Sequence, residues 1–503
     1  MKDSKALLIS TALGFLFSIL FFNESLGINL VYYELICFLA LFLTKNLDFS
    51  NDLFKYSIIA QGISLFSVIY NYSAIAIIVH MLFVILSIGI LVYPSVKNVF
   101  IGMLMSAYSM ICTPFKYLQN LYSSLNYKNF SSKSIWKYKL YILPLLIIII
   151  FINIYKSASP QFLALIKPIE DFIKRFIPNI WEYINFDYIA ILIVGIIGSS
   201  FLFIKTPQSE LVTLEDNSTE HIIRNRNKQK NRSGILSLKR ELKTGVFLLI
   251  VLNLLILIVN AFDIYWVWFN FQWNGEYLKQ FVHEGTYLLI FSILLSAGIV
   301  LYYFRKNQNF HQNSNFLKLL CYIWIAQNII LSISVAIRNY WYIDYFNLAY
   351  KRIGVFVFLI LVIYGLYTIF LKVKYRRSNY YLIRKNSLAL SVLLLITSLV
   401  NWDIIITKYN FKHADHAFIH FDYLVNMSPK AIPYMNYSLE ELKRIEAKQV
   451  NLFKDRGYYM NAEDFYKILQ NHKRVFIAEY AKAGKLSWNY SDQKTIRKLL
   501  IAM

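Results

Sequence analysis

The chain has 503 residues, of which 57% are hydrophobic and 16% charged, and its formal net charge is +23. Soluble globular proteins contain about 45–50% apolar and about 25% charged residues, so this composition argues against a soluble protein and favours a membrane protein. Three cysteines, Cys37, Cys112 and Cys321, lie within apolar runs, which argues against a disulfide framework or a cysteine metal site.

Apolar runs separated by short polar hinges follow one another from Ala6 to Trp402. A helix of about 20 apolar residues crosses about 30 Å of hydrocarbon, and helices satisfy their own backbone groups in lipid. We therefore predict an all-α, polytopic transmembrane helix bundle of about 12 helices. The predicted spans are 6–22, 28–44, 56–71, 73–93, 98–115, 140–155, 187–204, 244–266, 286–304, 319–337, 353–371 and 386–402. Residues 56–93 also fit a tight hairpin or a re-entrant pair.

Lysine and arginine are distributed unevenly between alternate connections of these spans. The richer set is 116–139, 205–243, 305–318 and 372–385, and the poorer set is 1–5, 45–55, 94–97, 156–186, 267–285 and 338–352. Cytoplasmic loops of membrane proteins are enriched in basic residues, so we expect the richer set in the cytoplasm. If these loops are cytoplasmic, counting the predicted spans outward from them places the N-terminus and the C-terminus outside the cytoplasm.

The connection 205–243 is expected to be a flexible cytoplasmic loop. Its densest basic stretch, residues 221–243, lies beside a predicted span, where it can attract anionic lipid headgroups at about 1 kcal/mol per charge. Nucleic acid is a weaker interpretation, because no aromatic residues alternate with the charges. The predicted partners are therefore membrane lipids and not nucleic acid.

After the last span the chain becomes polar, which divides it into a transmembrane domain, 1–402, and a tail, 403–503. Ser438 and Glu441 form a capping box that opens a helix over 439–456. Asn461 and Ser491 are N-cap residues for further helices over 462–483 and 492–502. We predict a small all-α soluble domain outside the cytoplasm.

Few ionisable residues lie inside the predicted spans, where a charged group costs roughly 2.5–3.5 kcal/mol. Asp263 shares a helical stripe with Asn253 and Asn260, which predicts a polar face directed at the bundle interior or a water-filled cavity. The alternative places Asp263 at the outer interface, beside Trp266 and Trp268.

Glu34 and His80 are the other ionisable residues of the spans. They could pair with each other or with Arg338 and hold helices together. The functional alternative is a proton or ion path through these groups.

A histidine-rich stretch follows the last span. His416 and His420 would share a helix face, and His413, Asp415 or Asp422 could add a further ligand to zinc or copper. The alternative, which we favour, is a solvated turn that is rich in histidine, so no metal or other cofactor is predicted.

Several separated stretches carry a common pattern. The residues are Gly285, Arg338, Tyr342, Arg352, Asn401, Asp403, Tyr409, Asn410, Asp422, Tyr423, Leu424, Ser428, Pro433, Trp488, Asn489 and Ser491. Together they resemble the uncharacterised bacterial membrane family called domain of unknown function 4173, which is related to 4153. The chain departs from that pattern at Trp402 and Lys430, and at Asn347 and Ala349, where glycine and threonine are usual.

The resemblance implies an integral protein of the bacterial cytoplasmic membrane but no known activity. Physically, Asn401 and Asp403 can cap and turn the chain as it leaves the bilayer. Motifs for nucleotide binding, serine hydrolysis and kinase chemistry are absent from the sequence. We therefore favour a non-enzymatic envelope, assembly or signalling component. The alternatives are a transporter or permease around Asp263, and an enzyme using Asp403, Asp422 or His416 on a lipid-linked substrate at the outer face.

Overall fold

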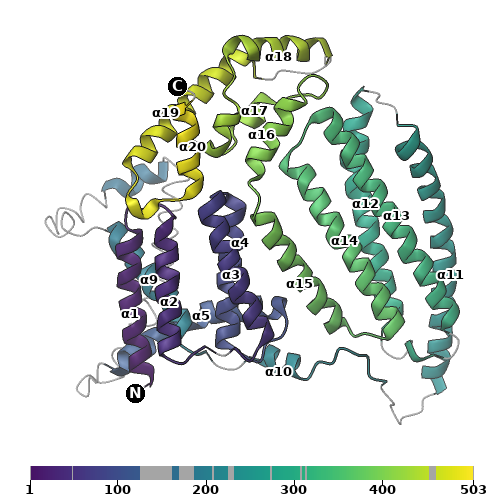
Figure 1. The fold of residues 1–503 in the computed structure, drawn as a ribbon. Helices are drawn as coiled ribbons and strands as arrows, with labels where there is room; N and C mark the ends of the chain where they lie inside the picture. The colour runs from purple at the N-terminus through teal and green to yellow at the C-terminus, as the bar shows by residue number, and fades with distance from the viewer. Residues whose placement is uncertain are drawn as a thin grey trace. The chain divides into compact units, whose positions relative to one another are not determined.

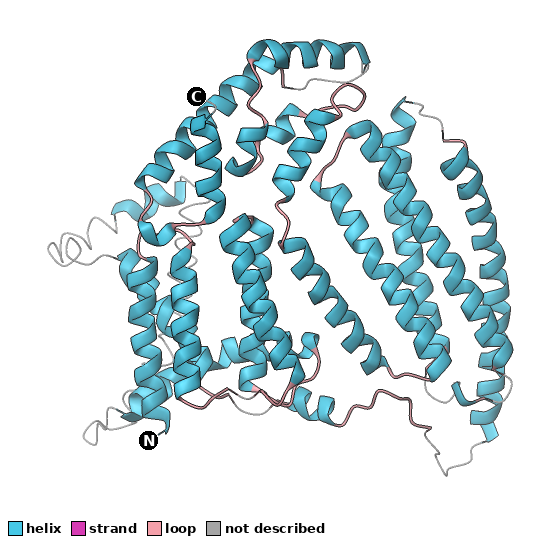
Figure 2. Ribbon diagram, in the orientation of Figure 1, coloured by secondary structure: helices cyan, strands magenta, loops and turns pink. Residues whose placement is uncertain are grey.

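The computed structural model describes residues 2–47, 49–124, 161–168, 186–206, 209–224, 232–271, 275–305, 309–311, 314–452 and 460–501. Within these ranges all regular structure is helical, and the one β contact is an isolated bridge between His221 and Arg377 (Figure 2). The all-α prediction is confirmed.

The apolar part of the chain forms a series of helices (Figure 1). They are α1 (Lys2–Phe21), α2 (Ile28–Leu43), α3 (Asp52–Asn71), α4 (Ala74–Val92), α5 (Val99–Ser124), α9 (Phe186–Phe203), α11 (Arg232–Asp263), the π-helix η1 (Ile264–Phe269), α12 (Gly275–Tyr303), α13 (Asn315–Phe346), α14 (Tyr350–Tyr375) and α15 (Asn379–Ser398). Each predicted span falls on one of these helices except 140–155, which lies outside the described residues.

Seven of the described helices are long and apolar enough to cross a membrane. An eighth span is possible if α15 and α16 (Trp402–Lys412), which are bent by 63° at their junction, count as one. Shorter apolar segments are Ile28–Leu43, Asp187–Phe203 and Tyr287–Tyr303. These helices support a multi-pass membrane protein, while the number of about 12 spans stays a prediction.

Polar residues at the hinges start several of these helices. Asn51 accepts a hydrogen bond from Leu53 N at the start of α3, and Ser73 accepts one from Ala76 N at the start of α4. The Ser378 side chain accepts one from Tyr381 N at the start of α15. Such caps pair backbone N–H groups that a helix leaves open at its first turn, so the polar hinges set where the apolar helices begin.

The chain divides into two compact units, residues 1–47 with 108–207 and residues 48–107 with 208–503. In the first unit α1 and α9 pack closely, since a Cβ on Gly14 would lie 2.7 Å from Ile196 Cα. Ser199 Oγ donates to Ser10 O at 2.7 Å, and Ser18 Oγ donates to Tyr188 OH at 3.1 Å. These pairs make α1 and α9 antiparallel.

This antiparallel pair corrects one predicted side. It places residues 1–5 at the end of α9 that leads into Lys205, whereas the sequence put 1–5 and 205–243 on opposite sides. When sides of the membrane are assigned by counting spans, each helix that does not cross the membrane reverses the side assigned to every connection after it. Residues 1–5 and Lys205 share a side when the chain between them crosses an even number of times.

Two connections in the second unit are also corrected. Asn51 Nδ2 donates to Pro94 O at 2.7 Å, and Ser387 Oγ of α15 donates to Asn98 Oδ1 at 2.9 Å. The chain before α3 and the chain between α4 and α5 therefore lie at the basic end of α15. The sequence placed both connections at the opposite end.

The predicted basic loop is largely structured. It contains α10 (Glu210–Asp216), and residues from 232 onward already belong to α11. Between these helices Ser378 N donates to Glu220 O at 2.9 Å, and Arg384 Nη1 lies 2.6 Å from Glu220 Oε1. The expectation of a flexible loop is therefore wrong for 209–224, which is attached to the turn between α14 and α15. Residues 225–231 lie outside the described residues.

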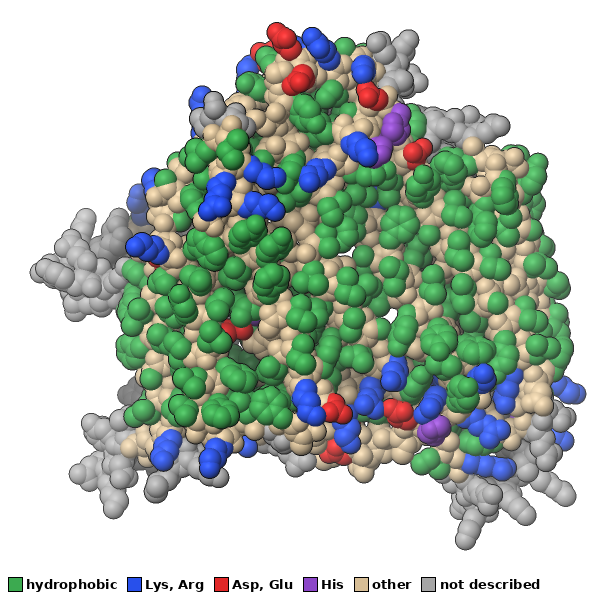
Figure 3. Space-filling view, in the orientation of Figure 1, with side chains coloured by type: hydrophobic (Ala, Val, Ile, Leu, Met, Phe, Trp, Pro, Cys, Tyr) green, Lys and Arg blue, Asp and Glu red, His purple; other side chains and the backbone are tan. Residues whose placement is uncertain are grey.

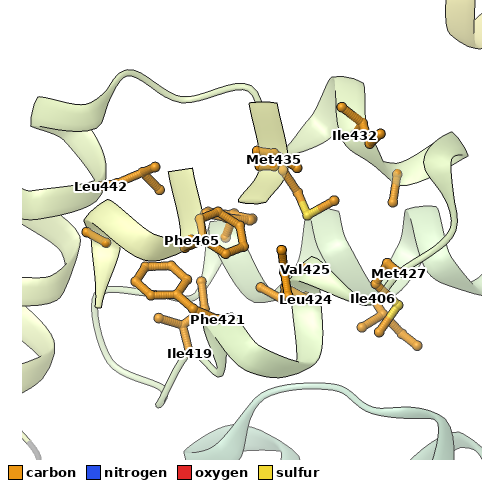
Figure 4. Close-up of a cluster of buried hydrophobic side chains, with 14 of the residues drawn as sticks. Ile406, Ile419, Phe421, Leu424, Val425, Met427, Ile432, Met435, Leu442 and Phe465 are labelled. Carbon is orange, nitrogen blue, oxygen red and sulfur yellow. The ribbon is translucent and has the colours of Figure 1, made fainter. Parts of the chain in front are cut away.

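The tail is helical and has its own core. After α16 it forms α17 (Phe421–Val425), the 3₁₀ helix η3 (Pro429–Tyr434), α18 (Leu439–Leu452), α19 (Ala462–Lys482), η4 (Lys485–Ser487) and α20 (Tyr490–Ile501). Phe421 and Phe465 stack at 4.7 Å between ring centroids, with Leu424 and Leu442 fully buried beside them (Figure 4). Apolar burial in this core stabilises the helical tail.

The three predicted helices of the tail are found in the structure, but α20 begins at Tyr490 and is capped by Asn489, so the predicted N-cap at Ser491 is wrong. Ser438 N donates to Glu441 Oε2 at 2.8 Å while Glu441 N donates to Ser438 Oγ at 3.2 Å, which is the predicted capping box. Asn461 caps α19, as predicted. Residues 453–459, at the end of the first predicted tail helix, lie outside the described residues.

Candidate functional site

A line of buried polar side chains runs along the contact between α11 and α13. We call it the α11–α13 seam, and its members are Asn253, Asn260, Asp263, Gln327, Asn328 and Arg338. Gln327 Nε2 donates to Asn253 Oδ1 at 2.7 Å, and Asn260 Nδ2 donates to Gln327 O at 3.1 Å. The stripe of α11 that the sequence singled out therefore faces α13.

Asp263 and Arg338 form an ion pair at one end of the seam. Both side chains are 7% exposed, so the pair is removed from solvent and Asp263 faces the interior of the helix bundle. Asp263 is the last α-helical residue before η1, where Trp268 Nε1 donates to Ser334 Oγ at 3.0 Å. Single-turn π-helices frequently accompany functional sites, so we expect any functional role of the seam at this end.

Some seam oxygens have no hydrogen-bond partner among the described residues. They are Asn260 Oδ1, Asp263 Oδ2, Gln327 Oε1 and Asn328 Oδ1. A buried acceptor without a partner is costly, and it commonly indicates an unseen water, an ion or a functional group. Gln327 and Asn328 were missed at the sequence level, although two adjacent amides inside the apolar run 319–337 were a usable signal.

Glu34 and His80 do not join this seam. His80 is buried in α4, where its Nδ1 lies 3.1 Å from Ser64 Oγ of α3. Glu34 lies half-buried on α2, in the other unit of the chain. Arg338 forms its ion pair with Asp263, and the predicted pairing of Glu34 with His80, or of either with Arg338, stays a prediction.

A second polar cluster fixes the tail to the connection between α13 and α14. Asn410 of α16 accepts from Leu348 N at 2.8 Å and donates to Leu348 O at 3.1 Å. Asn347 Nδ2 donates to Phe418 O at 3.1 Å, and Phe418 N donates to Tyr345 O at 2.7 Å. We call this contact the tail junction.

Asp403 extends the tail junction to the start of α14. Its Oδ1 accepts from Tyr350 OH at 2.7 Å and its Oδ2 from Ser428 N at 3.3 Å. Tyr423 OH accepts from Tyr350 N at 2.9 Å. Burial raises the pKa of Tyr423, against the smaller lowering effect of the Tyr350 N–H, so this phenol stays neutral.

Arg352, in the first turn of α14, also binds the connection between α13 and α14. Its Nη1 donates to Phe346 O at 2.7 Å and also to Asn347 O, and its guanidinium lies 4.5 Å from the Tyr342 ring centroid. Asn347 has φ 65° and ψ −179°, a backbone conformation that is nearly restricted to glycine. Glycine would adopt this conformation without strain, in agreement with the glycine expected here from the resemblance.

The remaining residues of the pattern cap helices or lie within helices and the tail core. Asn401 caps α16 and donates to Asn71 O at 3.1 Å, and Asn489 caps α20 through Asp492 N at 2.8 Å. Leu424 belongs to the tail core, Pro433 to η3 and Gly285 to α12. Trp488 is half-buried, and Ser491 is buried in α20.

Histidines after α16 do not form a metal site. Residues 413–420 form a turn and not a helix, so His416 and His420 do not share a helix face. His413 Nδ1 lies 2.8 Å from Tyr409 O, and its ring stacks on that of Tyr409. Nowhere in the part of the chain that the structure describes do three His, Cys, Asp or Glu side chains come together as metal ligands.

The acidic candidates for chemistry at this end are engaged in local contacts. Asp422 Oδ2 accepts from Met460 N at 3.2 Å, and Asp415 lies 2.6 Å from Lys448 Nζ. The hydrogen bond and the charge of Lys448 lower the pKa of Asp415. His416 is exposed and Asp403 is buried in the tail junction.

The family model described as Domain of unknown function (DUF4153) matches residues 6–437. The chain belongs to the DUF4153 family. No curated protein and no solved structure matches it significantly. The DUF4153 region contains the seam and the tail junction, whereas α18, α19 and α20 with Trp488, Asn489 and Ser491 lie beyond it.

Proposed function

We propose that this DUF4153 protein is a multi-pass, non-enzymatic component of the bacterial cytoplasmic membrane, close to the family called domain of unknown function 4173. Its helical tail is held at a fixed position outside the cytoplasm and acts through contacts in envelope assembly or signalling. One observation carries this proposal: Asn410, Asp403 and Arg352 all make hydrogen bonds to main-chain groups at the tail junction. Side chains that bind main-chain groups position a surface and are not free for chemistry.

The distribution of charge supports the orientation. In the second unit the basic turn between α14 and α15 and the segment 209–224 lie at one end of the helices, and the tail lies at the other (Figure 1). Short basic connections face the cytoplasm, where residues 221–243 would meet anionic headgroups. Reporters fused within 209–224 and after Asp403 should read as cytoplasmic and extracytoplasmic; the same compartment for both would overturn the orientation.

A complementation experiment tests the role of the tail. In a deletion strain with an envelope phenotype, Asn410→Ala should restore growth less well than wild type, because the tail loses its attachment while the membrane helices remain. Exposed Asn471→Ala is the matched control and should complement fully. Full complementation by Asn410→Ala at equal membrane abundance, with the tail shown by proteolysis to be released, would refute a function in the fixed tail.

A second candidate, transport, rests on the seam oxygens without partners beside η1. Buried polar groups inside spanning helices mark ion and proton paths in many membrane proteins. Proteoliposomes holding a pH dye, under an imposed potassium diffusion potential, would detect proton flux. Transport predicts flux in wild type that the double variant Asp263→Asn/Arg338→Gln loses; equal flux in both would assign the seam to packing.

A further inference from the structure

Two lysines contact one tyrosine at the edge of the tail, and a third lies one helical turn away. Tyr434 of η3 has Lys408 Nζ at 4.5 Å and Lys498 Nζ at 4.3 Å from its ring centroid. Lys498 Nζ also donates to Tyr434 OH at 2.6 Å. Lys494 lies one turn earlier on α20, 5.7 Å from the ring of Tyr490. We call Lys408, Lys494 and Lys498 with Tyr434 the lysine cluster.

The positive charge of the lysine cluster is not neutralised by carboxylates. Among the described residues, no ion pair includes Lys408, Lys494 or Lys498, whereas the nearby Lys430 lies 2.9 Å from Asp492 Oδ1. Burial alone would raise the pKa of Tyr434, yet the hydrogen bond from Lys498 and the three ammonium charges lower it. The phenol therefore experiences an excess of positive charge.

A pocket of about 280 Å³ opens beside the cluster. Lys408, Lys412, Tyr434, Asn436 and Tyr437 are among the residues that line it. Both lysines are exposed, so their ammonium groups are available to a ligand. Ammonium groups around aromatic walls suit a phosphate that is joined to a small organic group.

The lysine cluster lies where spanning helices end. Helix α16, which carries Lys408, bends by 63° from α15. Tyr490, at the first position of α20, stacks on Tyr70 in the last turn of α3 at 5.1 Å. Figure 3 shows Lys and Arg side chains gathered on the tail directly above the apolar surface of the helices. These positions place the cluster at the depth of lipid headgroups.

We propose that the lysine cluster binds the phosphate of an anionic phospholipid headgroup in the leaflet on the tail side. Each basic group near an anionic membrane surface adds about 1 kcal/mol of attraction, and three of them converge here. The enrichment of basic residues in short cytoplasmic loops does not restrict charges in a tail of this length. The site is separate from the segment 209–224, which is attached to the turn between α14 and α15 at the opposite end of these helices.

The test uses the full chain in phosphatidylcholine micelles to which phosphatidylglycerol is added, with bound lipid counted by native mass spectrometry. Lys408→Gln/Lys494→Gln/Lys498→Gln should weaken phosphatidylglycerol binding by about tenfold or more. Lys443→Gln/Arg444→Gln/Lys448→Gln removes the same charge from α18, on the far side of the tail (Figure 1), and should bind as wild type. Replacement of the three cluster lysines by arginine should preserve binding.

Other outcomes overturn the proposal. Unchanged affinity of the glutamine variant, or equal weakening in the α18 control, would show that no defined headgroup site exists. If inorganic phosphate competed as well as the lipid, the cluster would be a site for free anions. Should the triple variant not fold, Lys408→Gln alone, at an exposed position, must still lower affinity, and a failure to do so refutes the assignment.

Discussion

The α11–α13 seam and the tail junction are both buried and polar, but their hydrogen bonds differ in kind. In the seam, one ion pair and one amide–amide hydrogen bond join side chains of the two helices, and the other amides donate to helix carbonyls. Several acceptor oxygens of the seam have no partner among the described residues. At the tail junction, side chains bind main-chain groups of one short connection. The comparison teaches that polarity within this fold serves two purposes: it joins two helices inside the bundle, and it attaches the tail to the connection at their end.

The difference has a physical origin. Inside lipid the backbone groups of a helix are already bonded within that helix, so polar side chains on α11 and α13 find their partners in each other and in helix carbonyls that accept a second hydrogen bond. The α13–α14 connection is not helical, and its backbone groups need partners from elsewhere. The tail supplies them through Asn410, Asn347 and Tyr423.

The largest effect is expected at the ion pair of the seam. Asp263→Ala leaves Arg338 as a buried charge without its carboxylate, which costs about 3–5 kcal/mol of unfolding free energy. The double variant Asp263→Asn/Arg338→Gln should be more stable than either single variant. Denaturation of the detergent-solubilised protein measures both, and strictly additive losses would show that the two residues are not coupled.

At the tail junction, Asn410→Ala should cost about 2 kcal/mol, because both main-chain groups of Leu348 lose their partner. The tail should then be cut faster by protease, while the membrane helices keep their stability. Asn471→Ala on α19 removes an exposed amide and serves as control. If the two variants are cut at the same rate, Asn410 does not attach the tail.

A smaller change is expected at Asn347, whose positive φ suits glycine. Asn347→Ala keeps the unfavourable backbone conformation and loses the hydrogen bond to Phe418 O, whereas Asn347→Gly loses only the bond. We expect the glycine variant to be more stable than the alanine variant by about 1 kcal/mol. Thermal unfolding distinguishes them, and the reverse order would exclude strain at this position.

The smallest effect concerns Glu215, a buried carboxyl group of α10 outside the spanning helices. Burial raises its pKa, with the hydrogen bond from Tyr380 OH opposing that rise. Because the folded state holds the proton more tightly than the unfolded chain, stability is highest below the ordinary pKa of glutamate and falls as pH rises through the raised value. Hydrogen exchange of 209–224 should therefore become faster with pH beyond its intrinsic dependence.

Glu215→Gln should remove this additional pH dependence, since the amide remains neutral throughout. Exposed Glu210→Gln at the start of the same helix should leave it in place. An identical pH response in wild type and Glu215→Gln would show that this carboxyl group does not control the attachment of α10.

The sequence predicted local features well and pairings poorly. The capping box at Ser438 and the N-cap at Asn461 depend on residues a few positions apart, so they could be read directly. The stripe that contains Asp263 was also visible from helical spacing. The partner of Asp263 could not be predicted, because the local sequence does not show which helix packs against α11. Arg338 was expected to pair with Glu34 or His80.

Similar reasons explain the other errors. The stretch from His413 to His420 has histidines at helical spacing, yet the chain turns there so that Gln449 can bind Ala414 O and Ala417 O. The segment 209–224 looked like a flexible loop because its partner, the turn between α14 and α15, lies far along the chain. Sides of the N-terminal connections were wrong because counting assumes that every apolar helix crosses.

By itself the amino-acid sequence determined the all-helical class, the positions of the described apolar helices and the starts of α18 and α19. These follow from hydrophobic burial and from hydrogen bonds within a few residues. Only the tertiary structure decided that Asp263 meets Arg338, that Asn410 binds the α13–α14 connection, and that Lys408 and Lys498 converge on Tyr434. Such contacts join segments far apart in the chain, and they depend on how whole helices pack.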